Sequence, residues 1–241
     1  MTRKQKRIGF DRFIKLEWLE ETARLVDKGH TTPDINSWLE NSLENQIQGK
    51  DSRRKTRNVL TGVWSGVPVD IIPFRDDGLK LLKKLKPKEI LAVHWCMSIA
   101  AYPFFAFVTR QIGRLNKLQT EISSNQIQRR VVEHYGDTQS IHRAVARLIQ
   151  SLCDWNVLES KNKSLYNAIP SISTKDSSLL SWAIEAVFYA QSSSCLPFQQ
   201  IINDPCWFPF SFDIKTNDIR ENPRLELFRQ GLDEDFILLK K

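Results

Sequence analysis

The sequence predicts a mainly α-helical globular protein with helix-turn-helix and winged-helix elements and a small C-terminal β-hairpin. Apolar residues recur at helical spacing in segments that begin at capping residues or prolines and end at glycines. Pro103 interrupts a long uncharged run that would otherwise read as one helix. Three amphipathic segments precede two short apolar segments around a basic turn, which is the element order of a winged helix-turn-helix.

The composition of the 241-residue chain excludes several classes of protein. It is 41% hydrophobic and 26% charged, with nine glycines and ten prolines, which excludes disordered and collagen-like chains. The 35 Lys and Arg exceed the 28 Asp and Glu, and the net charge of +7 favours a negatively charged partner. No CxxC pair is present and no apolar run follows the charged N-terminus, so we expect a protein of the reducing cytoplasm.

Residues 1–75 are expected to form a basic arm followed by a helical region. Six Lys and Arg and one Asp lie in the first 15 residues, which gives this arm its positive charge. Apolar residues at helical spacing predict a helix over residues 16–26. Thr32 before Pro33 predicts the capped start of a second helix, and Gly49 ends it.

A third helix, over about residues 52–64, is predicted to carry a basic outer face. The side chains expected to point outward are Arg53, Arg54, Arg57 and Thr61. Two helices that meet at a short glycine turn, the second with a basic face, fit the loose description of a helix-turn-helix. A solvated face of an ordinary helical hairpin is the alternative interpretation.

Residues 76–170 are expected to form a central helical core with a winged helix-turn-helix. The two prolines of residues 67–74 predict an extended segment before it, and the five lysines of residues 80–88 are either a solvated linker or contacts to DNA phosphates. Residues 90–108 carry no formal charge and are nearly long enough to span a bilayer. Because a proline at position 103 disfavours a continuous helix, we predict two buried helices and no membrane span.

Residues 106–169 predict three helices and a hairpin. The second helix begins at a cap on Ser123 or Ser124 and ends at Gly136, and Asp137 or Thr138 caps the third. Apolar residues of the third helix fall on one stripe, which consists of Ile141, Val145, Leu148, Ile149 and Leu152.

The opposite face of this third helix is suited to a recognition helix. It displays polar and basic side chains without an acidic residue: Gln139, His142, Arg143, Ala146, Arg147 and Gln150. Such donors bond base edges and phosphates, and a small alanine allows close approach to the groove. Lys161 and Lys163 lie in a polar turn between two short strands, at the place of the wing. An ordinary amphipathic bundle with arginines on its solvated face is the alternative.

Residues 171–241 are expected to form a C-terminal helical region with a small β-hairpin. A polar connector is predicted at residues 171–178, before a buried helix at residues 179–190. The aromatic run at residues 207–212 is predicted to be core or docking surface, because no basic residues interleave with it. Apolar segments around Gly231 predict a hairpin whose turn carries Asp233, Glu234 and Asp235.

The sequence favours a protein without catalytic residues, metal or cofactor. Asp204 followed by Asp213 and Lys215 resembles the pattern by which nucleases hold Mg²⁺, but such short combinations arise often by chance. The four histidines lack metal-ligand spacing, although His134 and His142 could approach each other across a turn.

The overall organisation resembles the BrxA proteins of BREX phage-exclusion islands. The resemblance covers residues 16–169 and rests on the basic N-terminal region, the helical pair ending in residues 52–57, the uncharged helical centre and the later helix-turn-helix. It implies an all-helical, non-enzymatic DNA-binding component of a phage-defence system with two helix-turn-helix elements. The C-terminal hairpin has no counterpart in that organisation.

Double-stranded DNA is therefore the expected partner, with other proteins of a defence system as further partners and no membrane. The candidate DNA-binding residues are Arg53, Arg54, Lys55, Arg57, Arg129, Arg130, Gln139, His142, Arg143, Arg147, Lys161 and Lys163. Two other functions remain open: a scaffold whose apolar C-terminal third docks a larger defence enzyme, and a dimeric winged-helix transcriptional regulator that reads a palindrome.

Overall fold

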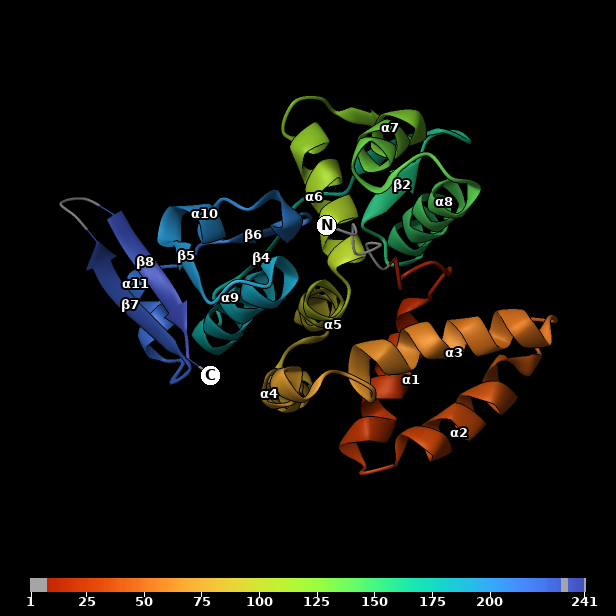
Figure 1. The fold of residues 1–241 in the computed structure, drawn as a ribbon, viewed down its shortest axis with the longest axis horizontal. Helices are drawn as coiled ribbons and strands as arrows, with labels where there is room; N and C mark the ends of the chain where they lie inside the picture. The colour runs from red at the N-terminus through yellow and green to blue at the C-terminus, as the bar shows by residue number, and fades with distance from the viewer. Residues whose placement is uncertain (1–7, 231–233, 241) are drawn as a thin grey trace, which may run out of the picture.

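The computed structural model describes residues 8–230 and 234–240, and this part of the chain is mainly helical with three small sheets (Figure 1). The helices of the first half are α1 (Leu16–Asp27), α2 (Thr32–Glu44), α3 (Lys50–Trp64), η1 (Val69–Ile71), α4 (Ile72–Lys84), α5 (Pro87–Ala101) and α6 (Pro103–Asn116). Those of the second half are α7 (Ser124–Tyr135), α8 (Gln139–Asp154), α9 (Ser177–Gln191), α10 (Phe198–Ile202), η2 (Pro205–Trp207) and α11 (Thr216–Arg220). The strands are β1 (Glu121–Ser123), β2 (Leu158–Ser160), β3 (Leu165–Ala168), β4 (Ile172–Thr174), β5 (Cys195–Pro197), β6 (Phe210–Phe212), β7 (Leu225–Gln230) and β8 (Glu234–Leu239).

Three separate pairings make the sheets. β1 and β2 both pair antiparallel with β3, and β4 pairs in parallel with β6. β5 and β7 both pair antiparallel with β8, with Gln230 opposite Glu234 and Arg229 opposite Asp235. The predicted turn positions of Glu234 and Asp235 are therefore wrong, because both residues continue the β8 ladder. Gly231 and Asp233 lie outside the described residues.

The described part of the predicted basic arm is packed against the protein. Phe10 and Ile14 are fully buried. The Ile14 N–H donates to Ser151 Oγ at 2.8 Å, and Trp155 Nε1 donates to the Ile14 carbonyl at 2.9 Å. Residues 8–15 are thus held against the C-terminal end of α8. Of the six basic residues of this predicted arm, the structure describes Arg12 and Lys15. The remaining four lie outside the described residues: Arg3, Lys4, Lys6 and Arg7.

A cluster of aromatic rings around Trp95 lies at the centre of the molecule. Trp95 is fully buried on α5 and has edge-on contacts with the rings of Phe105, Trp155, Phe208 and Phe210, at centroid distances of 5.1 to 6.3 Å. These partners come from α6, from the end of α8 and from the C-terminal region. One continuous hydrophobic core therefore joins the three regions predicted from the sequence.

The uncharged run is divided as predicted, with α5 ending at Ala101 and α6 beginning at Pro103. The two helices are bent by 119° at this break. Tyr102, between them, has extended backbone angles and donates from its hydroxyl to the Val59 carbonyl at 3.1 Å. Within residues 8–230 and 234–240, no single helix is long and apolar enough to cross a membrane.

Three local predictions are wrong. The cap of α2 is Thr31, not Thr32, because its side chain and that of Asp34 form a reciprocal capping box. Only Val67 and Pro68 of the segment predicted to be extended lie outside helices: residues 69–74 form η1 and the start of α4, where a proline in the first turn loses no helical hydrogen bond. The predicted polar connector contains β4, because the backbone of Ile172–Thr174 pairs with β6.

Gly113 allows α6 to lie directly against η2. A Cβ at this buried position would clash with the carbonyl oxygen of Pro205 and lie 3.1 Å from Cβ of Phe208. We expect Gly113→Ala to lower the free energy of unfolding by about 1–3 kcal/mol, because the backbone of η2 must shift. Denaturant unfolding checks this result. The control is Gly66→Ala, whose Cβ would have only ordinary contacts, and equal losses in both variants would contradict the prediction.

Candidate nucleic-acid interface

The elements from α6 to β3 pack together as one unit, called here the α6–β3 unit (residues 103–168). α6 leads through β1 to α7 and α8, and the chain then returns through β2 and β3. β3 lies between β1 and β2 in the antiparallel sheet. Gly136 ends α7 with a φ of +95°, a conformation that favours glycine, and only two residues separate it from α8. In Figure 1, α7, α8 and β2 lie together in the upper part of the view.

α8 is anchored by the apolar stripe predicted from the sequence. Ile141, Val145, Leu148, Ile149 and Leu152 are all at most 3% exposed. The N-terminus of the helix is capped by a threonine whose hydroxyl accepts from the backbone N–H three residues later, at 3.3 Å. The orientation of α8 is therefore set by its core face, and its opposite face is left to solvent.

The exposed face of α8 carries two arginines whose charges are not neutralised by described residues. Arg143 Nε donates to the Gln139 carbonyl at 3.3 Å, and Arg147 Nη1 donates to Gln150 Oε1 at 2.9 Å. No ion pair within the described ranges involves either arginine, although the exposed surface elsewhere holds many such pairs. Both guanidiniums therefore remain available to an external anion.

His142 is held by neighbours at the N-terminal end of α8. Its Nδ1 lies 3.0 Å from Gln128 Oε1, and its Nε2 lies 2.7 Å from Asp137 Oδ1. The sequence correctly predicts that the helix face itself has no acid, but the loop before it brings one to His142. This residue thus stabilises the turn between α7 and α8, and Asp137 would repel phosphate there.

The turn between β2 and β3 is built by Asn162 and displays two lysines. The Asn162 side-chain oxygen accepts from the N–H groups of Ser164 and Leu165 at 2.9 and 3.0 Å, which fixes the loop. Lys161 forms an ion pair with Glu159 at 3.0 Å. Lys163 is exposed and forms no ion pair with another described residue.

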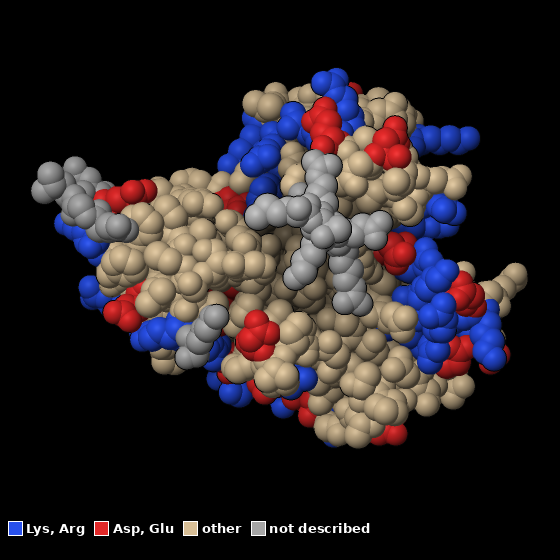
Figure 2. Space-filling model, viewed as in Figure 1, with Lys and Arg blue, Asp and Glu red and all other residues tan. Residues whose placement is uncertain are grey.

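The basic residues of α7 differ in their environments. Arg129 is largely exposed and forms an ion pair with Glu133 one turn later, at 3.3 Å. Arg130 is half-buried and forms no ion pair in the part of the chain that the structure describes. Figure 2 shows Lys and Arg side chains gathered around α6 and α7 and, separately, over α3, whereas the surface over α9 and α10 carries few charges.

The prediction that Arg53, Arg57 and Thr61 point outward from α3 is wrong. Arg53 is only 11% exposed and lies 2.7 Å from Glu40 Oε1, and Arg57 is 19% exposed and lies 3.0 Å from Oε2 of the same carboxylate. Arg57 also donates to the Asn36 carbonyl at 2.9 Å. Thr61 is buried. These arginines fasten α3 to α2, because one carboxylate between two helices attracts both guanidiniums.

Arg54 is exposed and Lys55 is partly exposed on α3, and both contact Asp51. Each nitrogen lies 2.6 Å from an oxygen of this carboxylate. Hydrogen bonds from Lys55 and Arg54 lower the pKa of Asp51 to about 2. The positive charge of this part of α3 is therefore partly neutralised by its own first turn.

The structure does not assemble the nuclease pattern into a metal site. Asp204 is buried and binds Arg110, whereas Asp213 is exposed and lies 3.3 Å from Lys215. Within the described ranges no group of three or more His, Cys, Asp or Glu could hold a metal ion. His134 stacks on Phe107, whereas His142 lies between Gln128 and Asp137.

Sequence reasoning missed the ion pair between Arg110 and Asp204, which borders a cleft beside the α6–β3 unit. The two residues are separated by 94 positions, so no local spacing connects them. Burial alone would raise the pKa of Asp204, but the hydrogen bonds and charge of Arg110 and the Cys206 N–H outweigh it and keep this pKa below its usual range.

In comparisons with known proteins, no protein family, curated protein or solved structure matches the chain.

Proposed function

We propose that this protein binds double-stranded DNA without acting as an enzyme, and that the α6–β3 unit is its DNA-binding element. The observation that carries the proposal is the exposed face of α8, where Arg143 and Arg147 lie without acidic partners among the described residues. The resemblance in organisation to BrxA proteins extends the proposal to a role in bacterial phage defence, with other defence proteins as partners.

The order of the elements supports this assignment. A helix, a short strand, two helices joined by a tight turn and a two-stranded hairpin follow one another, as in a winged helix-turn-helix. In that arrangement the last helix enters the major groove, which is wide enough for one α-helix. By its place in the order of elements, α8 would correspond to this helix and the β2–β3 turn with Lys163 to the wing.

The chemistry of α8 also suits DNA. Gln139 and Arg143 lie near its N-terminal end, the part of a recognition helix that contacts base edges. Arg147 lies one turn further along, where it would contact a base or a phosphate. Ala146, between the arginines, is exposed and small enough to let the backbone approach the groove.

α3 is the weaker candidate for reading DNA. Four of its five basic residues are already paired: Arg53 and Arg57 with Glu40, and Arg54 and Lys55 with Asp51. If α3 bound DNA phosphates, these ion pairs would have to break. The free energy needed to break them would offset part of the attraction to the phosphates. We therefore assign α3 a supporting contact with the duplex at most.

Duplex binding over a salt series tests the proposed function. If about four phosphates are neutralised, the slope of log affinity against log salt is about −3.6, and affinity falls about 150-fold between about 50 and 200 mM salt. Fluorescence anisotropy with a labelled duplex measures this slope. No binding at micromolar protein in low salt, or a flat response to salt, would instead favour the scaffold. Binding only as a dimer to a palindrome would favour the transcriptional regulator.

A further inference from the structure

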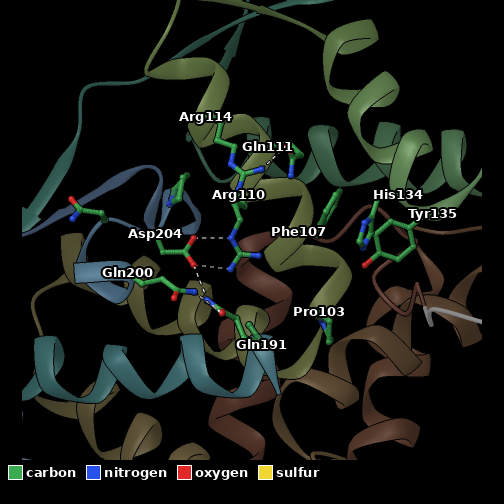
Figure 3. Close-up of a pocket in the computed structure, with 13 residues that line it drawn as sticks. Pro103, Phe107, Arg110, Gln111, Arg114, His134, Tyr135, Gln191, Gln200 and Asp204 are labelled. Atoms are coloured by element: carbon green, nitrogen blue, oxygen red, sulfur yellow. Dashed lines mark hydrogen bonds and ion pairs between the residues drawn. The ribbon is translucent and has the colours of Figure 1, made fainter. Parts of the chain in front are cut away.

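A cleft of about 1050 Å³ lies beside the contact of α6 with η2, between the α6–β3 unit and the C-terminal region (Figure 3). α6 and α7 form one side, and α9, α10 and η2 form the other. Its volume is at the upper end of the range for small-molecule sites. Its lining includes aromatic rings, cations, carboxamides and one carboxylate.

The aromatic side of the cleft comes from α6 and α7. The rings of Phe107 and His134 stack at a centroid distance of 4.3 Å with only 16° between their planes. Tyr135 meets Phe107 edge-on at 5.4 Å. Figure 3 shows Phe107, His134 and Tyr135 grouped on one side of the cleft, across from Asp204 and Gln200. His134 is exposed, so its ring offers a planar surface to an incoming flat ligand.

Arg110 lies between the two sides and is fixed in place. Its Nε and one Nη each donate to Asp204 at 2.8 Å, and the pair is 17% and 5% exposed. The same carboxylate also accepts from Gln191 Nε2 at 3.2 Å and from the Cys206 N–H at 2.9 Å. Because four donors surround Asp204, its charge is compensated and does not repel an anion strongly.

The remaining charge in the cleft is positive. Arg114 is exposed one turn after Arg110 and forms no ion pair with a described residue; its Nη1 lies 3.5 Å from Gln111 Oε1. With Arg110 balanced by Asp204, Arg114 leaves the lining with one net positive charge. An anionic group is thus favoured at the α6 side of the cleft.

Carboxamides supply both donors and acceptors. Gln111 is 4% exposed on the α6 side of the cleft, and Gln200 donates to Gln191 at 3.1 Å on the opposite side. Amide groups match the mixed donor and acceptor edges of a nucleobase, as they do in nucleic-acid recognition. A flat heteroaromatic group and an anionic group would therefore both find partners here.

We propose that this cleft binds a nucleotide. The base would lie on the His134 ring with its edge toward the carboxamides, and the phosphate would lie against Arg114. This assignment rests on the lining of the cleft and not on the proposed DNA-binding function, because no residue of the exposed α8 face takes part in it.

Isothermal titration of the full chain tests the proposal with adenosine monophosphate, adenosine and inorganic phosphate as probes. We expect adenosine monophosphate to bind about tenfold more tightly than adenosine, because only the former contacts Arg114. His134→Ala should weaken both about tenfold by loss of stacking, whereas Arg114→Ala should weaken only the phosphorylated ligand. Both positions are exposed, so the fold is retained.

Arg129→Ala is the matched control, because this exposed arginine of α7 does not line the cleft. Competition by a short single-stranded oligonucleotide would identify a strand as the source of the nucleotide, and no competition would identify the free nucleotide. The proposal is overturned if none of the four common ribonucleoside monophosphates binds at up to about 10 mM. It is also overturned if His134→Ala and Arg114→Ala bind as the parent does.

Discussion

Replacing Arg143 or Arg147 with alanine is expected to weaken duplex-DNA binding about 5- to 150-fold for each arginine that contacts a base. This range corresponds to about 1–3 kcal/mol for a lost bidentate contact. Replacing an arginine that contacts only phosphate should weaken DNA binding less. It should also reduce the slope of log affinity against log salt by about 1. Both side chains point away from the core stripe, so the free energy of unfolding should change by no more than about 0.5 kcal/mol. Anisotropy titrations of each variant over the same salt series measure these effects.

Arg54→Ala provides the matched control for this experiment. Arg54 is also an exposed arginine on a helix, but it lies on α3 and is paired with Asp51. Its replacement should change DNA affinity far less than either α8 variant. Arg53 and Arg57 are poor controls, because each is tied to Glu40 and its loss would also disturb the fold. If Arg54→Ala abolishes binding while the α8 variants bind normally, α3 is the reading helix and the assignment is wrong.

Arg224→Met is expected to lower the free energy of unfolding by about 3–5 kcal/mol. Glu185 lies in the middle of α9 with no exposed surface, and Arg224 donates to both of its oxygens at 2.9 Å. A third bond from Arg224 reaches Asp77 on α4 at 2.7 Å, so one guanidinium joins three segments of the chain. Removing the guanidinium leaves the buried Glu185 carboxylate without its cation, which strongly destabilises the folded state. Urea denaturation measures the loss.

Two further variants show whether the missing charge causes the instability. Arg229→Met makes the same substitution at an exposed ion pair with Asp235 and should cost no more than about 1 kcal/mol. Replacing Glu185 and Arg224 together with methionine should recover part of the loss, because no unpaired charge remains buried. An Arg224→Met variant as stable as the Arg229→Met variant would show that Glu185 does not depend on its partner.

The elements that the sequence predicted best are those whose signals are local. The cap of α8 lies three residues from the N–H that it binds, and its core stripe repeats within 12 residues. The break at Pro103 follows from the geometry of one residue.

The sequence could not predict contacts between charges that are distant along the chain. The orientation of Arg53 and Arg57 was mispredicted because periodicity alone does not show that Glu40 of the preceding helix faces them. Glu185 appears in the sequence as a single acid in an apolar helix, and its partner comes 39 residues later. Tertiary packing decides such pairs, so helical spacing gives no information about them.

The contacts of Trp95 restrict how this protein can evolve. Trp95 precedes the α6–β3 unit in the chain, and its ring is enclosed by aromatic side chains from within and after that unit, so no region possesses a complete interior of its own. A gene fusion or recombination event that transferred the α6–β3 unit alone would leave Phe105 and Trp155 without the ring that covers them. The regions must instead be inherited together, and substitutions in one part of the aromatic cluster must be matched in the others. A shortened fragment made in the laboratory would likewise lack part of this cluster.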